Sequence, residues 1–146
     1  MRPNRIIVGE VRGAETVDML QAFSTGHDGS LSTGHGNSTR DMLNRLETMI
    51  LMGMDIPALA VRRQLASGID FMIHLGRLRD KRRVILEITE IDGCVDGEIV
   101  LNPIYRFCET ERHNGEKVLG DWIKVGEMRH TEKLQYPLTD SEFGCI

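Results

Sequence analysis

The period of the hydrophobic pattern changes once along this chain, near Ile69, and this change constrains the fold more than any other feature. Before it, apolar residues recur mostly at the three- and four-residue spacing of a helix face. After it, they alternate, as in strands with one buried face. The order predicts an α/β fold, with helices first and antiparallel strands on the C-terminal side.

The N-terminal third predicts two short strands around one helix. Residues 5–8 are almost wholly apolar and end at Gly9, a pattern typical of a strand buried on both faces of a parallel sheet. Residues 13–23 carry one apolar stripe at helical spacing, and residues 29–33 suggest a second strand of small residues. This order predicts a βαβ unit whose strands are parallel neighbours or near-neighbours.

Two further helices are expected before the change of period. The clearer one covers residues 37–52, with Ser38 and Asp41 placed as a capping pair and a glycine as its stop. A shorter helix restarts at residues 55–57 and ends at Ser67-Gly68.

The first alternating segment predicts a half-buried strand. Phe71, Ile73 and Leu75 lie on one side of it, while Met72 and His74 lie on the other, polar side.

Two more strands follow. Residues 84–88 repeat the alternation, residues 92–97 form a turn-rich stretch, and residues 98–107 give an antiparallel return. Pro103 favours an edge position for that return strand, because proline has no N–H to donate to a neighbour. A further turn is expected at residues 113–115, and the pattern around Trp122 is too irregular to assign.

Composition excludes several kinds of protein. With 18 basic and 22 acidic side chains and a net charge of -4, the chain lacks the basic surface that nucleic-acid binding requires. Its 3 cysteines form no C-x-x-C pair, which argues against a disulfide framework or a zinc site. No apolar run reaches the ~20 residues that span a bilayer. A cytoplasmic protein without nucleic-acid partners is therefore expected.

Polar residues cluster where the two predicted parallel strands end. Glu10 and Arg12 follow the first strand, and His35 follows the second. Ligands of open α/β sheets bind outside the carboxyl ends of the strands, so these side chains are expected around one cleft. A carboxylate, a guanidinium and an imidazole suit phosphoryl transfer. The alternative is that Glu10 only complements a helix dipole, which is the commoner role of such a residue.

His27 and His35 do not have the spacing of a metal-ligand pair. They lie eight residues apart along the chain, which is not the i, i+4 spacing of a helical metal pair, and this spacing argues against a transition-metal site.

Three blocks, in this order and spacing, carry a resemblance to a known family. Residues 2–13, residues 26–35 and Arg45-Leu46-Glu47 resemble the type II/IV secretion system ATPases, in particular the CpaF-type ATPase of tight-adherence (Tad) pili. The resemblance covers residues 1 to about 110 and weakens beyond them. It implies that residues 1–110 are the C-terminal part of a RecA-like P-loop NTPase domain, and that 111–146 are a short extension of strand and irregular structure.

The resemblance also implies a site and its ligands. Residues 6–10 match an atypical Walker B segment, in which Glu10 is catalytic and holds Mg²⁺ through water. His35 belongs to the family's histidine box and is the second catalytic residue. Four residues are expected near the ATP: Gly9, Arg12, His27 and Thr33. The complete protein is expected to form a hexameric ring at the cytoplasmic face of the membrane, bound to platform proteins of the secretion or pilus machine.

The departures from the family matter equally. The sequence has no G-x-x-x-x-G-K-[ST] phosphate-binding loop and no Gly-Lys dipeptide. The expectation is therefore a C-terminal fragment of a secretion ATPase that is inactive alone. The alternative is a non-catalytic interaction module that docks onto full-length subunits. Gly34 and Gly36 replace larger residues beside His35 and are expected to loosen its loop.

Overall fold

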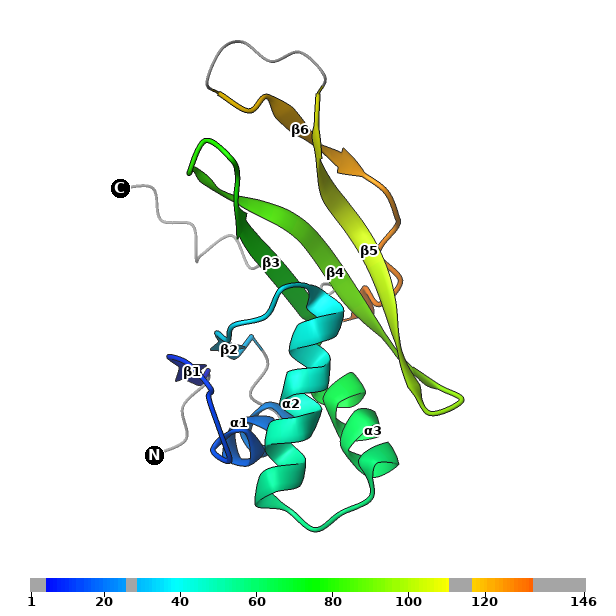
Figure 1. The fold of residues 1–146 in the computed structure, drawn as a ribbon. Coiled ribbons are helices and arrows are strands. Elements are labelled where there is room, and N and C mark those ends of the chain that lie inside the picture. Colours follow the sequence, from blue (N-terminus) through cyan, green and yellow to red (C-terminus); the bar gives the residue numbers. More distant parts are fainter. Residues whose placement is uncertain (1–4, 26–28, 111–116, 133–146) are drawn as a thin grey trace, which may run out of the picture.

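The computed structural model describes residues 5–25, 29–110 and 117–132. Three helices and two short strands gather at one end of the molecule, and a long antiparallel sheet extends away from them (Figure 1). The elements are β1 (Ile7–Val8), α1 (Thr16–Ser24), β2 (Leu31–Ser32), α2 (Thr39–Gly53), α3 (Ala58–Gly68), β3 (Phe71–Arg77), β4 (Arg83–Val95), β5 (Glu98–Glu109) and β6 (Gly120–Lys124). The predicted α/β class, with antiparallel strands on the C-terminal side, is confirmed.

The βαβ unit is also confirmed, with shorter strands than predicted. β1 and β2 pair in parallel, Ile7 opposite Leu31 and Val8 opposite Ser32. The expectation that the first strand is buried on both faces is wrong, because Ile7 is 77% exposed and Leu31 is 62% exposed. In the described part of the chain, the helices cover only the opposite face of this small sheet.

The core lies between the three helices and the helix-facing side of β4 and β5. Its most buried side chains are Ile50 of α2 and Val61 and Leu65 of α3, as their helical spacing requires. The capping pair at the start of α2 is confirmed: the Asp41 amide donates to Ser38 Oγ at 3.1 Å.

The apolar side of β3 is the exposed one, and the side predicted to be polar packs against the core. Phe71, Ile73 and Leu75 lie exposed on what we call the outer face, the face of the sheet turned away from α2 and α3. Met72, from the side predicted to be polar, packs against the helical core instead. Alternation defines two faces of a strand, but contacts with the helices decide which face is covered.

The predicted turn at residues 92–97 is shorter than expected. Only Asp96 and Gly97 form it, with φ values of 50° and 84°. These are the left-handed conformations of a two-residue hairpin turn. Asp92 and Gly93 instead belong to β4, where the register shifts between Ile91 and Cys94. The prediction of a longer turn is therefore wrong. Asp and Gly are common both in turns and at β-bulges, so the sequence pattern does not distinguish the two.

Pro103 does not lie in an edge strand, so that prediction is wrong. β5 pairs with β4 on one side and with β6 on the other. Proline is accommodated because the β6 ladder ends at Tyr105, and the register against β4 shifts beside it, between Ile88 and Thr89. The unassigned region around Trp122 forms β6, whereas residues 113–115 lie outside the described residues.

The turn between β3 and β4 is fastened by Asp80. Its side chain, only 6% exposed, accepts hydrogen bonds from Arg82 Nε at 2.8 Å and from the Val118 amide at 2.9 Å. The Arg82 hydrogen bond, which outweighs the opposing effect of burial, and the backbone amides lower the pKa of Asp80 from 3.8 to about 2.

This low pKa predicts acid sensitivity of the turn. The stability that Asp80 contributes is present above pH 3.8 and is lost as the pH falls from 3.8 through about 2. We expect Asp80→Asn to flatten the fall of unfolding free energy in that range, measured by urea denaturation from pH 5 to 2. Asp121→Asn, at an exposed site in β6, is the matched control. An unchanged acid profile for Asp80→Asn would contradict the assignment.

Candidate active site

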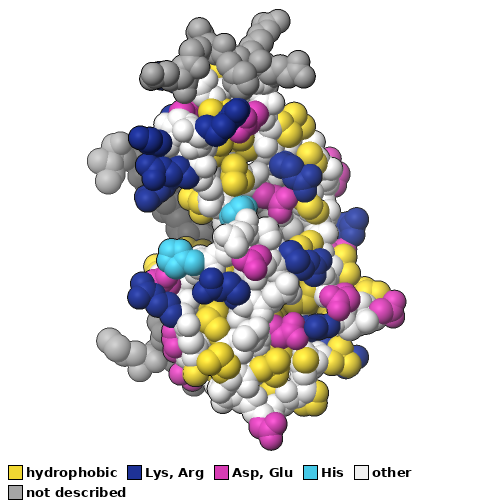
Figure 2. Space-filling model, viewed as in Figure 1, with side chains coloured by type: hydrophobic (Ala, Val, Ile, Leu, Met, Phe, Trp, Pro, Cys, Tyr) yellow, Lys and Arg dark blue, Asp and Glu magenta, His cyan; other side chains and the backbone are white. Residues whose placement is uncertain are grey.

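Two hydrogen bonds hold the carboxyl ends of β1 and β2 together. The Val11 amide donates to the Thr33 carbonyl at 3.1 Å, and Thr33 Oγ1 donates to the Gly9 carbonyl at 2.5 Å. These bonds place Glu10, from the end of β1, beside His35, from the loop after β2. In Figure 2, histidine, acidic and basic side chains lie together on the left of the molecule, in the region of these two strand ends.

Glu10 lies between a guanidinium and an imidazole. Its Oε2 accepts hydrogen bonds from Arg12 Nε at 2.8 Å and Nη2 at 2.5 Å, while His35 Nε2 lies 2.7 Å from Oε1. The Arg12 hydrogen bond, acting against partial burial and aided by the charges of Arg12 and His35, holds the pKa of Glu10 below its ordinary value. The carboxylate is therefore ionised at neutral pH.

Five of the six predicted site residues thus share one surface: Gly9, Glu10, Arg12, Thr33 and His35. The sixth, His27, lies outside the described residues.

Sequence reasoning missed Glu15, which orients the Arg12 backbone. Its Oε1 accepts hydrogen bonds from the Arg12 amide at 2.7 Å and the Gly13 amide at 3.0 Å. The signal was an acidic residue in the first turn of the helix predicted at residues 13–23, since acidic side chains near a helix N-terminus bind free backbone amides. Glu15 thereby fixes the direction in which the Arg12 side chain projects from the backbone.

The glycines beside His35 permit a close approach to α2. A Cβ at Gly34 would lie 2.3 Å from Met42 Cε, and one at Gly36 would lie 3.1 Å from the Met42 amide nitrogen. The structure therefore gives both glycines a packing role, where the sequence suggested only a looser loop. A larger side chain at either position would push the loop away from α2.

We expect Gly36→Ala to destabilise the protein by about 1–3 kcal/mol, because the neighbouring atoms belong to a helix backbone that cannot move aside. Gly9→Ala is the control, since nothing lies within 4 Å of its added Cβ. Urea denaturation at pH 7 measures both. Equal stability of the two variants would show that the loop tolerates the extra carbon.

The Glu10 carboxylate fits magnesium held through water. Oε1 is inaccessible to solvent, and its contact in the described residues is His35 Nε2 at 2.7 Å. Once His35 moves aside, this oxygen can accept from a metal-bound water, and Mg²⁺ usually keeps several waters when protein carboxylates are few. Among residues 5–25, 29–110 and 117–132, no group of three or more His, Cys, Asp or Glu side chains is arranged to hold a metal directly.

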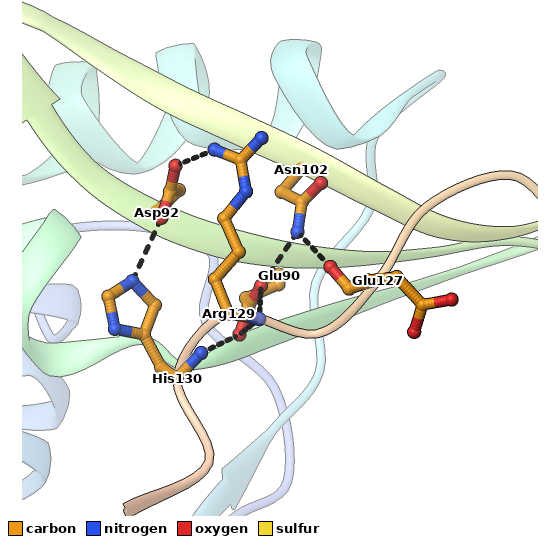
Figure 3. Close-up of polar contacts among 6 residues, drawn as sticks. All are labelled: Glu90, Asp92, Asn102, Glu127, Arg129 and His130. Carbon is orange, nitrogen blue, oxygen red and sulfur yellow. Dashed lines mark hydrogen bonds and ion pairs between the residues drawn. The ribbon is translucent and has the colours of Figure 1, made fainter.

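A second polar cluster, on the outer face, was not predicted. Glu90 is 1% exposed and accepts hydrogen bonds from the backbone amides of Arg129 at 3.0 Å and His130 at 2.9 Å, and from Asn102 Nδ2 at 2.8 Å (Figure 3). Asp92 pairs with the side chains of Arg129 and His130.

The cluster fastens the chain after β6 to the sheet. We call residues 125–132 the strap; it runs back beside β5 (orange in Figure 1). The sequence signal was an acid, Glu90, that continues the alternating row of Val84, Leu86 and Ile88. A charge in such a row requires partners, and the strap provides them.

Comparisons with known proteins bear on the family of this chain. The model of the type II/IV secretion system protein family matches residues 1–114. A putative conjugal transfer protein of Mycobacterium tuberculosis (strain ATCC 25618 / H37Rv) is 43% identical over 88 residues, covering 60% of this chain and 25% of the relative. An uncharacterized protein of Methanocaldococcus jannaschii is 34% identical over 141 residues, covering 91% of this chain and 50% of the relative.

A solved structure supports the fold. The VirB11 ATPase from the Brucella suis type IV secretion system, in complex with sulphate, superposes with a TM-score of 0.58 at 32% identity, covering 62% of this chain and 28% of that one. The match confirms the predicted partial RecA-like fold.

The chain spans half or less of the length of each of these relatives. No helix in the described residues is long and apolar enough to cross a membrane. With more than half of its length matched by the family model, the chain belongs to the type II/IV secretion system protein family.

Proposed function

We propose that this chain supplies the catalytic carboxylate and the histidine loop of a secretion ATPase. The observation that carries the proposal is the placement of ionised Glu10 between Arg12 and His35 at the ends of two parallel strands. The names of the relatives, which point to conjugal transfer and type IV secretion, support the same class of protein. In this proposal the complete protein couples ATP hydrolysis to protein export or pilus assembly.

The side chains divide the chemistry between them. Glu10 accepts a hydrogen bond from the attacking water and orients it, and the same carboxylate would hold Mg²⁺ through water. Arg12 and His35 lie beside the same carboxylate and offset negative charge as the terminal phosphoryl group passes to water and ADP leaves. When bound with ATP, Mg²⁺ would neutralise charge on the phosphates. His27 and Thr33 complete the histidine loop near the nucleotide.

Other parts of the complete protein would provide the rest. This sequence contains no phosphate-binding loop, so the groups that hold the ATP phosphates are assigned to a segment outside it, and this chain alone is expected to be inactive. The sulphate named for the VirB11 crystal structure is a tetrahedral anion like a phosphate, which supports anion binding in this family. A hexameric ring, a membrane platform as partner and the CpaF-type role in Tad pili are parts of the proposal that rest on residues 2–13, 26–35 and 45–47.

The test is a fused ATPase, in which this chain replaces the matched segment of the VirB11 relative. We expect the fusion to hydrolyse ATP with Mg²⁺, and the 146-residue chain alone to show no ATP binding at micromolar concentrations by calorimetry. A fusion that folds and binds ATP without hydrolysing it would contradict the catalytic role. That result would favour the alternative, an interaction module that docks onto full-length subunits.

A further inference from the structure

A groove with two arginines lies next to Glu10. It has a volume of about 300 Å³ and is lined by Arg12, Asn44, Arg45, Thr48 and Met49. Arg12 comes from the loop after β1, whereas the other four side chains come from α2. The groove therefore joins the candidate active site to a helix surface that the proposed catalytic step does not use.

The two guanidinium groups differ in their partners. Arg45 is exposed and makes no hydrogen bond or ion pair with any residue that the structure describes. Arg12 is bound to Glu10, but its side chain is 78% exposed, and the contacts to Glu10 use only Nε and Nη2. Because a guanidinium has five N–H donors, Arg12 retains donors on Nη1 for a second anion. Two cations beside one groove, with donors free, form a site suited to a phosphate group.

The bond between Arg12 and Glu10 has a chemical consequence. Two donors of Arg12 occupy Oε2, and His35 lies against Oε1. In this arrangement Oε2 has no free direction towards a reacting water on the Arg12 side. Glu10 becomes fully available only when Arg12 turns away, and an anion in the groove gives Arg12 an alternative partner.

We propose that the groove binds a phosphate group between Arg12 and Arg45, and that this binding draws Arg12 away from Glu10. Arg12 gains little by itself, because it gives up the Glu10 carboxylate to bind the phosphate. Arg45 gives up no partner in the described residues, and it therefore supplies the additional attraction. The carboxylate of Glu10 is then free to orient water only when phosphate is present. The regulatory meaning of this exchange rests on the proposed function, whereas the exchange itself involves only residues of this chain.

The experiment is an NMR titration of the 146-residue chain with sodium phosphate, with ionic strength held constant by sodium chloride. The Arg12 Nε–H signal and the Glu10 carboxyl carbon signal report the ion pair directly. We expect both signals to shift saturably and together. Arg45→Ala is expected to weaken phosphate binding about tenfold, the equivalent of one charge-assisted contact. Arg63→Ala, an exposed arginine of α3 away from the groove, is the matched control and is expected to bind as the wild type does.

Three results would overturn the proposal: no saturable shift, equal weakening by Arg45→Ala and Arg63→Ala, or phosphate binding that leaves the Arg12 and Glu10 signals unchanged. A parallel titration with ATP identifies the source of the phosphate. Tighter binding of ATP that depends on Arg45 indicates the phosphates of a nucleotide, and equal binding indicates free phosphate. No hydrolysis is measured, so failure here is distinct from failure of the fused ATPase.

Discussion

Glu10→Gln in the fused ATPase is expected to lower kcat by about 10²–10⁴-fold, the usual contribution of a positioned acid or base. The amide has nearly the same shape but cannot carry the negative charge that Arg12 and His35 now surround. KM for ATP is expected to change little, because the phosphates are held by other groups. Steady-state phosphate release, with ATP varied, separates the two parameters.

The control for this variant is Asp55→Asn. Asp55 is an exposed carboxylate between α2 and α3, away from the strand ends. The substitution Asp55→Asn removes one negative charge without changing the candidate active site, and the ATPase activity is expected to stay at the parent level. A fall in kcat of less than about tenfold for Glu10→Gln would fit a helix-dipole role better than a catalytic one.

Glu90→Gln is expected to reduce the free energy of unfolding by about 2–4 kcal/mol. Glu90 is buried and accepts hydrogen bonds from two backbone amides of the strap and from Asn102. Hydrogen bonds to a charged acceptor contribute about 1.5–3 kcal/mol each, and the amide NH₂ of glutamine would face donors, leaving them unsatisfied. Urea denaturation at pH 7 gives the change, and hydrogen exchange at the Arg129 and His130 amides shows whether the strap has opened.

The contribution of Glu90 to the free energy of unfolding depends on pH. Burial raises the pKa of Glu90, but the amides of His130 and Arg129 and the Asn102 side chain outweigh it, so the pKa lies below the ordinary value of 4.5. The stability that Glu90 contributes is therefore present above pH 4.5 and is lost as the pH falls through the lower folded-state value. Glu90→Gln removes that part of the acid profile.

Glu132→Gln is the control, because Glu132 is an exposed residue of the same strap. It is expected to leave both stability and amide exchange unchanged. Wild-type exchange rates in Glu90→Gln would mean that the strap is held by other contacts.

The sequence alone was sufficient for the parts of the molecule that depend on local pattern. Residues 37–52 predicted α2 because the apolar spacing and the Ser38 cap both act within a few turns of one helix. Glu10, Arg12 and His35 were predicted to meet because the carboxyl ends of neighbouring parallel strands share one edge, whatever surrounds them.

The tertiary structure decided what depends on contacts between distant segments. The direction faced by Phe71, Ile73 and Leu75 was fixed by which side of the sheet α2 and α3 cover, which strand alternation does not encode. Likewise, the burial of Glu90 depends on amides 39 and 40 residues away in the strap. The hydrophobic period of a segment describes that helix or strand alone. The free energy of a buried charge depends instead on the hydrogen-bond donors that folding brings to it from distant parts of the chain.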